Sequence, residues 1–109
     1  MKTLVFSINP DKVNKKLSLE SKEFLSKKLK EYNFVKKKNQ PENSRVKVFA
    51  IEELNIEARV SIKEDSFGEH ISMRVSNPTD VISVMISETT TFFTNKNYKV
   101  GEKDNCQAV

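Results

Sequence analysis

Four segments of the chain alternate apolar and polar residues, the pattern of a β-strand with one buried and one exposed face. The alternation has no exception in residues 56–63, and the turn residues that follow, ending at Gly68, predict a hairpin with residues 70–76. In residues 45–51 both faces of the predicted strand are partly apolar, which predicts a central place in the sheet. The four predicted strands are residues 2–8, 45–51, 56–63 and 70–76.

The hairpin is expected to expose a polar face of mixed charge, because the apolar residues of each strand occupy every second position and therefore point to the same side of the sheet. The outward residues are Glu57, Arg59, Ser61 and Lys63 on one strand and His70, Ser72 and Arg74 on the other.

Two further segments repeat their apolar residues at helical spacing. In residues 18–32 the apolar positions are three to four residues apart, and Ser18 is a suitable N-cap. The second helix is expected to start at Asn77 as the capping residue, with Pro78 in the first helical position. Its apolar positions are Val81, Ile82, Met85, Ile86, Phe92 and Phe93.

These elements predict an α+β fold with the order β-α-β-β-β-α. A sheet with one polar face must bury the other, so we expect a two-layer sandwich: a four-stranded sheet with two helices on one face. The first strand, first helix and second strand would form a right-handed crossover, with those strands side by side or one apart. The chain would be one domain over residues 1–95, followed by a polar, flexible tail over residues 96–109.

Composition supports one folded domain and narrows the chemistry. The 109 residues are 37% hydrophobic and 31% charged, a profile typical of globular chains. No apolar run has the length of a membrane span or a signal-peptide core, so we expect a cytoplasmic protein without a membrane partner. Cys106 is the single cysteine, which excludes an internal disulfide and predicts an incidental exposed thiol. His70 is the single histidine and is interpreted as an ordinary imidazole rather than a metal ligand.

Motifs for catalysis are missing from the sequence. There is no Gly-rich phosphate loop, GxSxG, HExxH or CxxC motif, and the chain has only two glycines. A ribonuclease that uses His70 with Glu69 and Arg74 is a weaker alternative, because three such residues within one strand are not a specific signal. We therefore expect no enzymatic activity, no cofactor, no metal and no small-molecule substrate.

Positive charge is concentrated in the first half of the chain. Residues 1–50 contain 13 Lys and Arg against 5 Asp and Glu, a net charge of +8, whereas residues 51–109 contain 6 against 10, a net charge of −4. Lysines that only keep a small domain soluble would give the same count, so the placement of the lysines decides between a role in solubility and the binding of a polyanion. If they bind a polyanion, they should gather on one outward plane. The candidate nucleic-acid-binding residues are Lys22, Lys27, Lys28, Lys30, Lys36, Lys37, Lys38, Arg45, Lys47, Arg59 and Arg74.

Three parts of the sequence carry a family resemblance, which extends over about residues 2–95. Residues 18–34 read SLESKEFLSKKLKEYNF, residues 57–62 and 70–75 read EARVSI and HISMRV, and residues 80–86 read DVISVMI. In order, they resemble the Lys-rich first helix, the last hairpin and the second helix of the ribosome hibernation-promoting factors, also called ribosome-associated inhibitor A or the sigma-54 modulation family.

The resemblance implies a non-enzymatic protein that binds the RNA of the small ribosomal subunit near the decoding region and blocks translation. In that family the second helix ends with several Lys and Arg residues, whereas residues 87–95 here read SETTTFFTN. The resemblance therefore implies only the half of the RNA-binding surface that the first helix carries.

Two other functions fit the same pattern. One is a small protein-binding inhibitor or regulator, of the kind that mobile elements encode, which would use its acidic second half or exposed Phe49, Ile51 and Phe67. The other is a module like the double-stranded-RNA-binding domain, which the order helix, three strands, helix resembles. That domain has a lysine cluster at the start of its second helix, where this chain has residues 77–80, NPTD.

Overall fold

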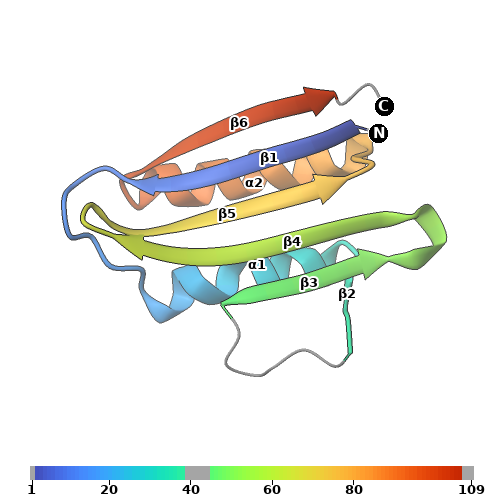
Figure 1. Cartoon of the computed structure of the whole chain (residues 1–109), viewed down its shortest axis with the longest axis horizontal. Helices are drawn as coiled ribbons and strands as arrows, with labels where there is room; N and C mark the ends of the chain where they lie inside the picture. Colours follow the sequence, from blue (N-terminus) through green and yellow to red (C-terminus); the bar gives the residue numbers. More distant parts are fainter. Residues whose placement is uncertain (1, 39–44, 107–109) are drawn as a thin grey trace.

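The computed structural model describes residues 2–38 and 45–106, with only the backbone described for Lys2 and residues 102–106. Its elements are β1 (Lys2–Pro10), α1 (Leu19–Glu31), β2 (Val35–Lys36), β3 (Val46–Ile51), the short 3-10 helix η1 (Glu52–Leu54), β4 (Ile56–Asp65), β5 (Gly68–Ser76), α2 (Asp80–Asn95) and β6 (Tyr98–Cys106). The strands form one antiparallel sheet in the order β2-β3-β4-β5-β1-β6. Both helices lie against the same face of this sheet, behind it in the view of Figure 1.

The predicted α+β class is confirmed, but the expected sheet of four strands is wrong, since the described residues form a sheet of six. The crossover between the first two predicted strands is also wrong. The hairpin of β4 and β5 lies between β3 and β1, so two strands separate β1 from β3, and β1 and β3 run antiparallel to each other. Nor is β3 central: its outer neighbour is the two-residue β2, and its second apolar side, with Val46 and Val48, lies on the uncovered face.

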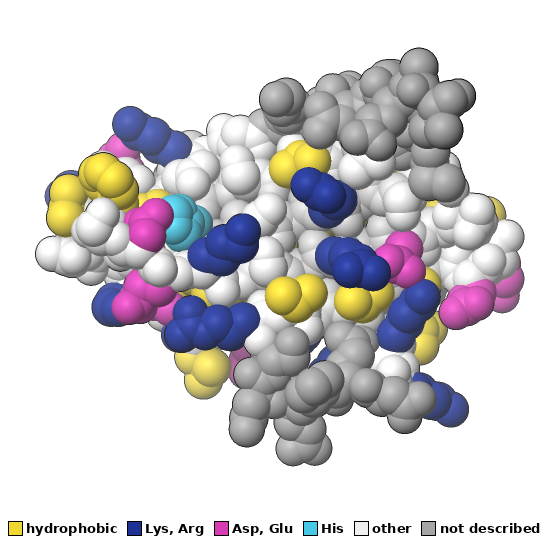
Figure 2. Space-filling view, in the orientation of Figure 1, with side chains coloured by type: hydrophobic (Ala, Val, Ile, Leu, Met, Phe, Trp, Pro, Cys, Tyr) yellow, Lys and Arg dark blue, Asp and Glu magenta, His cyan; other side chains and the backbone are white. Residues whose placement is uncertain are grey.

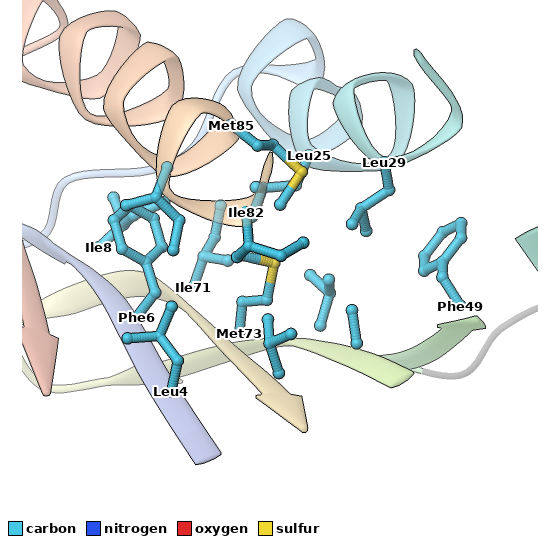
Figure 3. Packing of buried hydrophobic residues seen from close by; sticks show 14 of the residues in the cluster. Leu4, Phe6, Ile8, Leu25, Leu29, Phe49, Ile71, Met73, Ile82 and Met85 are labelled. Atoms are coloured by element: carbon cyan, nitrogen blue, oxygen red, sulfur yellow. The ribbon is translucent and has the colours of Figure 1, made fainter. Parts of the chain in front are cut away.

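The core lies between the helices and the covered face of the sheet (Figure 3). In β1, Leu4, Phe6 and Ile8 are buried, as the alternation predicts, and Ile71 and Met73 of β5 are buried beside them. Full burial of each such side chain contributes about 1.5–3 kcal/mol, so the alternation of the strands determines which face is covered. The helices supply Leu25, Leu29, Ile82 and Met85 from above.

Aromatic rings join the two helices to each other. Phe24 of α1 stacks on Phe92 of α2 with ring centroids 3.8 Å apart, and Phe93 meets both rings edge-on. Aromatic pairs of this kind add about 0.5–1.5 kcal/mol beyond the area they bury. This contact holds the helices side by side as one layer.

The N-cap of the first helix is confirmed and that of the second is not. The Ser18 hydroxyl accepts a hydrogen bond from the Ser21 amide at 3.1 Å. The second helix starts at Asp80 with Thr79 as its cap residue, whereas Asn77 has a φ of 54° and its side-chain amide donates to the Asn55 carbonyl at 2.9 Å. Asn77 therefore ties the end of β5 to the loop before β4 and leaves the helix start to Thr79.

Asparagine takes the backbone conformation that glycine usually provides. The described non-glycine residues with positive φ are Asn14, Asn33, Asn55, Asn77 and Asn97. Asparagine tolerates the left-handed region because its short side chain bonds locally, and this chain has only two glycines. At position 68 only glycine fits, because a Cβ there would lie 2.6 Å from the Lys15 carbonyl oxygen.

The segment from residue 96 is mostly a strand, which corrects the expected flexible tail. Asn97 follows the end of α2 in the left-handed conformation and turns the chain into β6, which pairs with β1 over nine residues. Residues 107–109 and the side chain of Cys106, expected to be an exposed thiol, lie outside the described part of the chain. None of the described helices has the length and apolar character to span a membrane.

Candidate nucleic-acid interface

The cationic residues predicted from the sequence lie on opposite sides of the molecule. Those of α1 are Lys22, Lys27, Lys28 and Lys30, and they belong to the helix layer. Arg59 and Arg74 point away from the helices, since their strand neighbours Ala58 and Val75 are buried in the core. The expected single plane of positive charge is therefore wrong, because the strand alternation directs these arginines to the face opposite α1.

In the helix layer, carboxylates neutralise most of the lysines. The Lys28 ammonium donates to the Glu88 carboxylate at 2.7 Å, and this hydrogen bond raises the pKa of Lys28 and lowers that of Glu88. The Tyr32 hydroxyl also donates to Glu88 and lowers the pKa of Glu88 further. The other pairs that involve the helices are Lys22 with Glu69, Lys27 with Glu23, Lys28 with Glu31, and Lys96 with Glu20.

Lys47 and Arg45 do not join the arginines of the uncovered face either. Lys47 lies opposite Val60, which is buried against the helices, so its side chain starts on the helix side. Arg45 precedes β3 and lies near Glu64, whose pKa is lowered by a hydrogen bond from Lys16 and, to a smaller extent, by the charge of Arg45.

Of the three lysines that follow α1, Lys37 reaches the uncovered face. Its ammonium donates to the Glu57 carboxylate at 2.8 Å. Lys36 and Lys38 are exposed at the edge of the sheet next to β3. Of the eleven predicted residues, the structure thus brings together Lys37, Arg59 and Arg74.

The uncovered face of the sheet, which we call the open face, arranges its polar side chains in rows across the strands. In one row Arg59 of β4 lies directly opposite Arg74 of β5, and in another Lys63 lies opposite His70. Between them runs a row of hydroxyls from Ser61, Ser72 and Ser7. Adjacent rows are about 7 Å apart, because side chains on one face are two residues apart along a strand. Figure 2 looks onto this face and shows Lys and Arg side chains over its middle, with the His to their left.

The open face carries more positive than negative charge. Glu57 accepts hydrogen bonds from Lys37 and from Arg59, at 2.8 and 3.1 Å, and these contacts lower the pKa of Glu57. Within the described residues, Arg74 and Lys63 make no ion pair. Like charges directly opposite each other in a sheet are destabilising, so this arrangement favours a bound anion.

The ribonuclease trio considered from the sequence is not assembled. Glu69 is buried on the helix side, where its carboxylate accepts the Leu17 amide at 2.8 Å. His70 lies on the open face with its Nε2 2.9 Å from the Asp65 carboxylate and its Nδ1 3.3 Å from the Asn9 side-chain oxygen. Arg74 is two rows away. Among the described residues no group of three or more His, Cys, Asp or Glu is close enough to hold a metal ion.

The other sequence alternatives gain little from the geometry. Phe49 is buried in the core and Ile51 is partly buried against it, so of the three residues expected to form an exposed protein-binding surface only Phe67 is exposed. The first turn of α2 carries Asp80 and no lysine, unlike the start of the second helix in a double-stranded-RNA-binding domain.

The alternation placed Lys63, Ser61 and Ser72 on one outward polar face with the arginines, but sequence reasoning did not include Lys63 or the serine row among the candidate binding residues. Which residues lie opposite each other depends on the register of the hairpin, and the register follows from the turn at Ser66 and Phe67, with Asp65 opposite Gly68.

Comparisons of the chain with protein-family models, curated proteins and solved structures found no match.

Proposed function

We propose that this chain is a non-enzymatic RNA-binding protein whose contact surface is the open face of the sheet. The observation that carries the proposal is the pair of arginines, Arg59 and Arg74, placed opposite each other on adjacent strands. Arginine donates to phosphate oxygens in a planar, bidentate geometry, so two adjacent arginines suit a phosphate-bearing backbone.

The composition of the open face favours contacts to phosphate and sugar over contacts to bases. Apart from the imidazole of His70, its described side chains include no aromatic ring on which a base could stack. Lys63 and the row formed by Ser7, Ser61 and Ser72 add donors beside the arginines. Such contacts give affinity that depends on salt and tolerates sequence changes.

The family resemblance implies the small ribosomal subunit as the RNA partner, with a block of translation as the consequence, but through the first helix, so the proposal keeps this partner and assigns the contact to a different surface. In this proposal the contact is made by the open face, and the lysines of α1 serve the structure of the helix layer. Lys28 supports this division, because its ammonium contacts two carboxylates of that layer, those of Glu31 and Glu88.

A matched pair of double variants tests the proposal. Arg59→Glu with Arg74→Glu reverses two charges on the open face, and Lys27→Glu with Lys30→Glu reverses two on α1. We expect the arginine variant to lose RNA binding in fluorescence anisotropy with single-stranded and duplex RNA at low salt. The α1 variant should keep most of it. The salt dependence of the wild type should be steep, with a slope of about 0.7–0.9 per phosphate contact.

Sedimentation of the protein with small ribosomal subunits, at low and raised salt, tests the partner. Association that weakens with salt and is lost in the arginine variant supports it. RNA binding that is unchanged by the arginine reversal, or lost equally in the α1 variant, contradicts the assignment of the open face.

A further inference from the structure

A groove at one end of the sheet exposes apolar side chains between charged walls. Its volume is about 1000 Å³, and it is lined by β2 and the residues just after it, by η1 and by the start of α2. Three of its apolar side chains are strongly exposed: Val35 at 70%, Leu54 at 57% and Val81 at 51%. Exposed apolar residues that cluster in one concave place are typical of an interaction surface.

The charges on the groove walls have opposite signs. Lys36 and Lys38 line the wall that follows β2, and Glu52 and Glu53 of η1 line another. None of these four makes an ion pair among the described residues. Each of the other described Asp and Glu side chains lies at ion-pair distance from a Lys or, for Asp65, from His70, with the exception of Asp80 in the first turn of α2. Unpaired acids thus concentrate at the end of the molecule that also exposes unpaired lysines.

We infer that this groove is the interface for a second copy of the same chain. A two-fold axis through the apolar centre would place the basic wall of each copy against the acidic wall of the other. The apolar side chains would then be buried in the middle, with two sets of ion pairs around them. Burial of Leu54, Val35 and Val81 supplies the affinity, and the charges fix the orientation of the two copies. This inference does not depend on the RNA-binding role of the open face.

Charge reversal of one wall at a time gives a test with an internal rescue. Lys36→Glu with Lys38→Glu makes both walls acidic, and Glu52→Lys with Glu53→Lys makes both basic. Each variant alone should be a monomer in analytical ultracentrifugation, whereas the wild type should sediment at twice the chain mass of 12.6 kDa. In an equimolar mixture of the two variants, every acidic wall meets a basic one, so the mixture should recover the dimer mass.

Two controls separate a docking effect from a folding effect or a general charge effect. Lys27→Glu with Lys30→Glu changes the net charge by the same amount as the Lys36 and Lys38 reversal but lies on α1, and it should remain dimeric. Leu54→Asp removes the apolar contact and should be monomeric with an unchanged circular dichroism spectrum. A monomeric wild type, wall variants that stay dimeric, or a variant mixture that stays monomeric would each overturn the inference.

Discussion

The two faces of the sheet carry positive charge in different ways. On the helix side, Lys22, Lys27 and Lys28 each have a carboxylate partner within 4 Å. On the open face, Arg59 lies opposite Arg74, and a single carboxylate, that of Glu57, bonds Arg59 and Lys37 together. The number of lysines in a segment therefore does not locate a binding surface. Unneutralised positive charge does, because only that charge gains from an external anion.

The largest expected effect contrasts the two faces within one strand. Phe6 is fully buried on the covered face, and Ser7 is its neighbour on the open face. Phe6→Ala should lower the free energy of unfolding by about 3–5 kcal/mol. Ser7→Ala should change it by no more than about 0.5 kcal/mol. Chemical denaturation of both variants measures this, and similar losses for both would mean that the open face is also part of the packed structure.

The next effect concerns the buried carboxylate on the helix side. Glu69→Ala leaves the Leu17 amide without its acceptor and removes the partner of Lys22. An unsatisfied buried donor costs about 1–3 kcal/mol, so the midpoint of denaturation should fall accordingly. RNA affinity should stay unchanged in this variant at a temperature where it is folded. A loss of RNA affinity without a loss of stability would show that Glu69 takes part in RNA binding.

A smaller effect of opposite sign is expected on the open face. Arg74→Thr removes one of two like charges that lie opposite each other and places a good strand former there. Stability should therefore rise by about 0.2–1 kcal/mol while RNA affinity falls. Lys27→Gln on α1 is the control and should leave RNA affinity unchanged. If Arg74→Thr lowers stability, the arginine pair contributes to the fold and the contrast between the faces weakens.

The smallest effect is a change in pH dependence in the helix layer. The hydrogen bonds from Lys28 and Tyr32 lower the pKa of Glu88, so Glu88 contributes stability above the ordinary carboxyl pKa of 4.5 and loses it as the pH falls through the lowered value. Glu88→Gln should therefore show a shallower loss of stability on acidification than the wild type. Thermal melts between neutral pH and pH values below 4.5 measure the two slopes. Equal slopes would show that this ion pair adds nothing to the fold.

The strands and helices that bury one face were predictable because burial leaves a period in the sequence. The alternation over residues 56–63 and the helical spacing of Phe24, Leu25 and Leu29 each correspond to an element of the structure. The missed strands leave weaker signals. β2 has only two residues, and β6 begins in a polar stretch after Asn97, whose left-handed conformation leaves no periodic signal in the sequence.

The candidate site was predictable only in part, because it depends on pairing between distant segments. The outward direction of Arg59 and Arg74 follows from alternation, and their position opposite each other follows from the register of the hairpin. The pairs of Lys27 with Glu23 and of Lys28 with Glu31 have helical spacing and could have been predicted within α1. The other partners of the α1 lysines, Glu69 and Glu88, come from β5 and α2, so no pattern within residues 18–32 shows them.

Four of the left-handed asparagines, all but Asn14, bear on how the protein ages. An asparagine deamidates when the amide nitrogen of the next residue attacks the side-chain carbonyl, and a glycine in that next position makes the attack easiest. Here the residues after Asn33, Asn55 and Asn97 are Phe34, Ile56 and Tyr98, all with buried side chains, and Asn77 is followed by a proline, which has no amide hydrogen to lose. These turns therefore combine the backbone freedom of glycine with resistance to the chemical damage that an Asn-Gly pair invites.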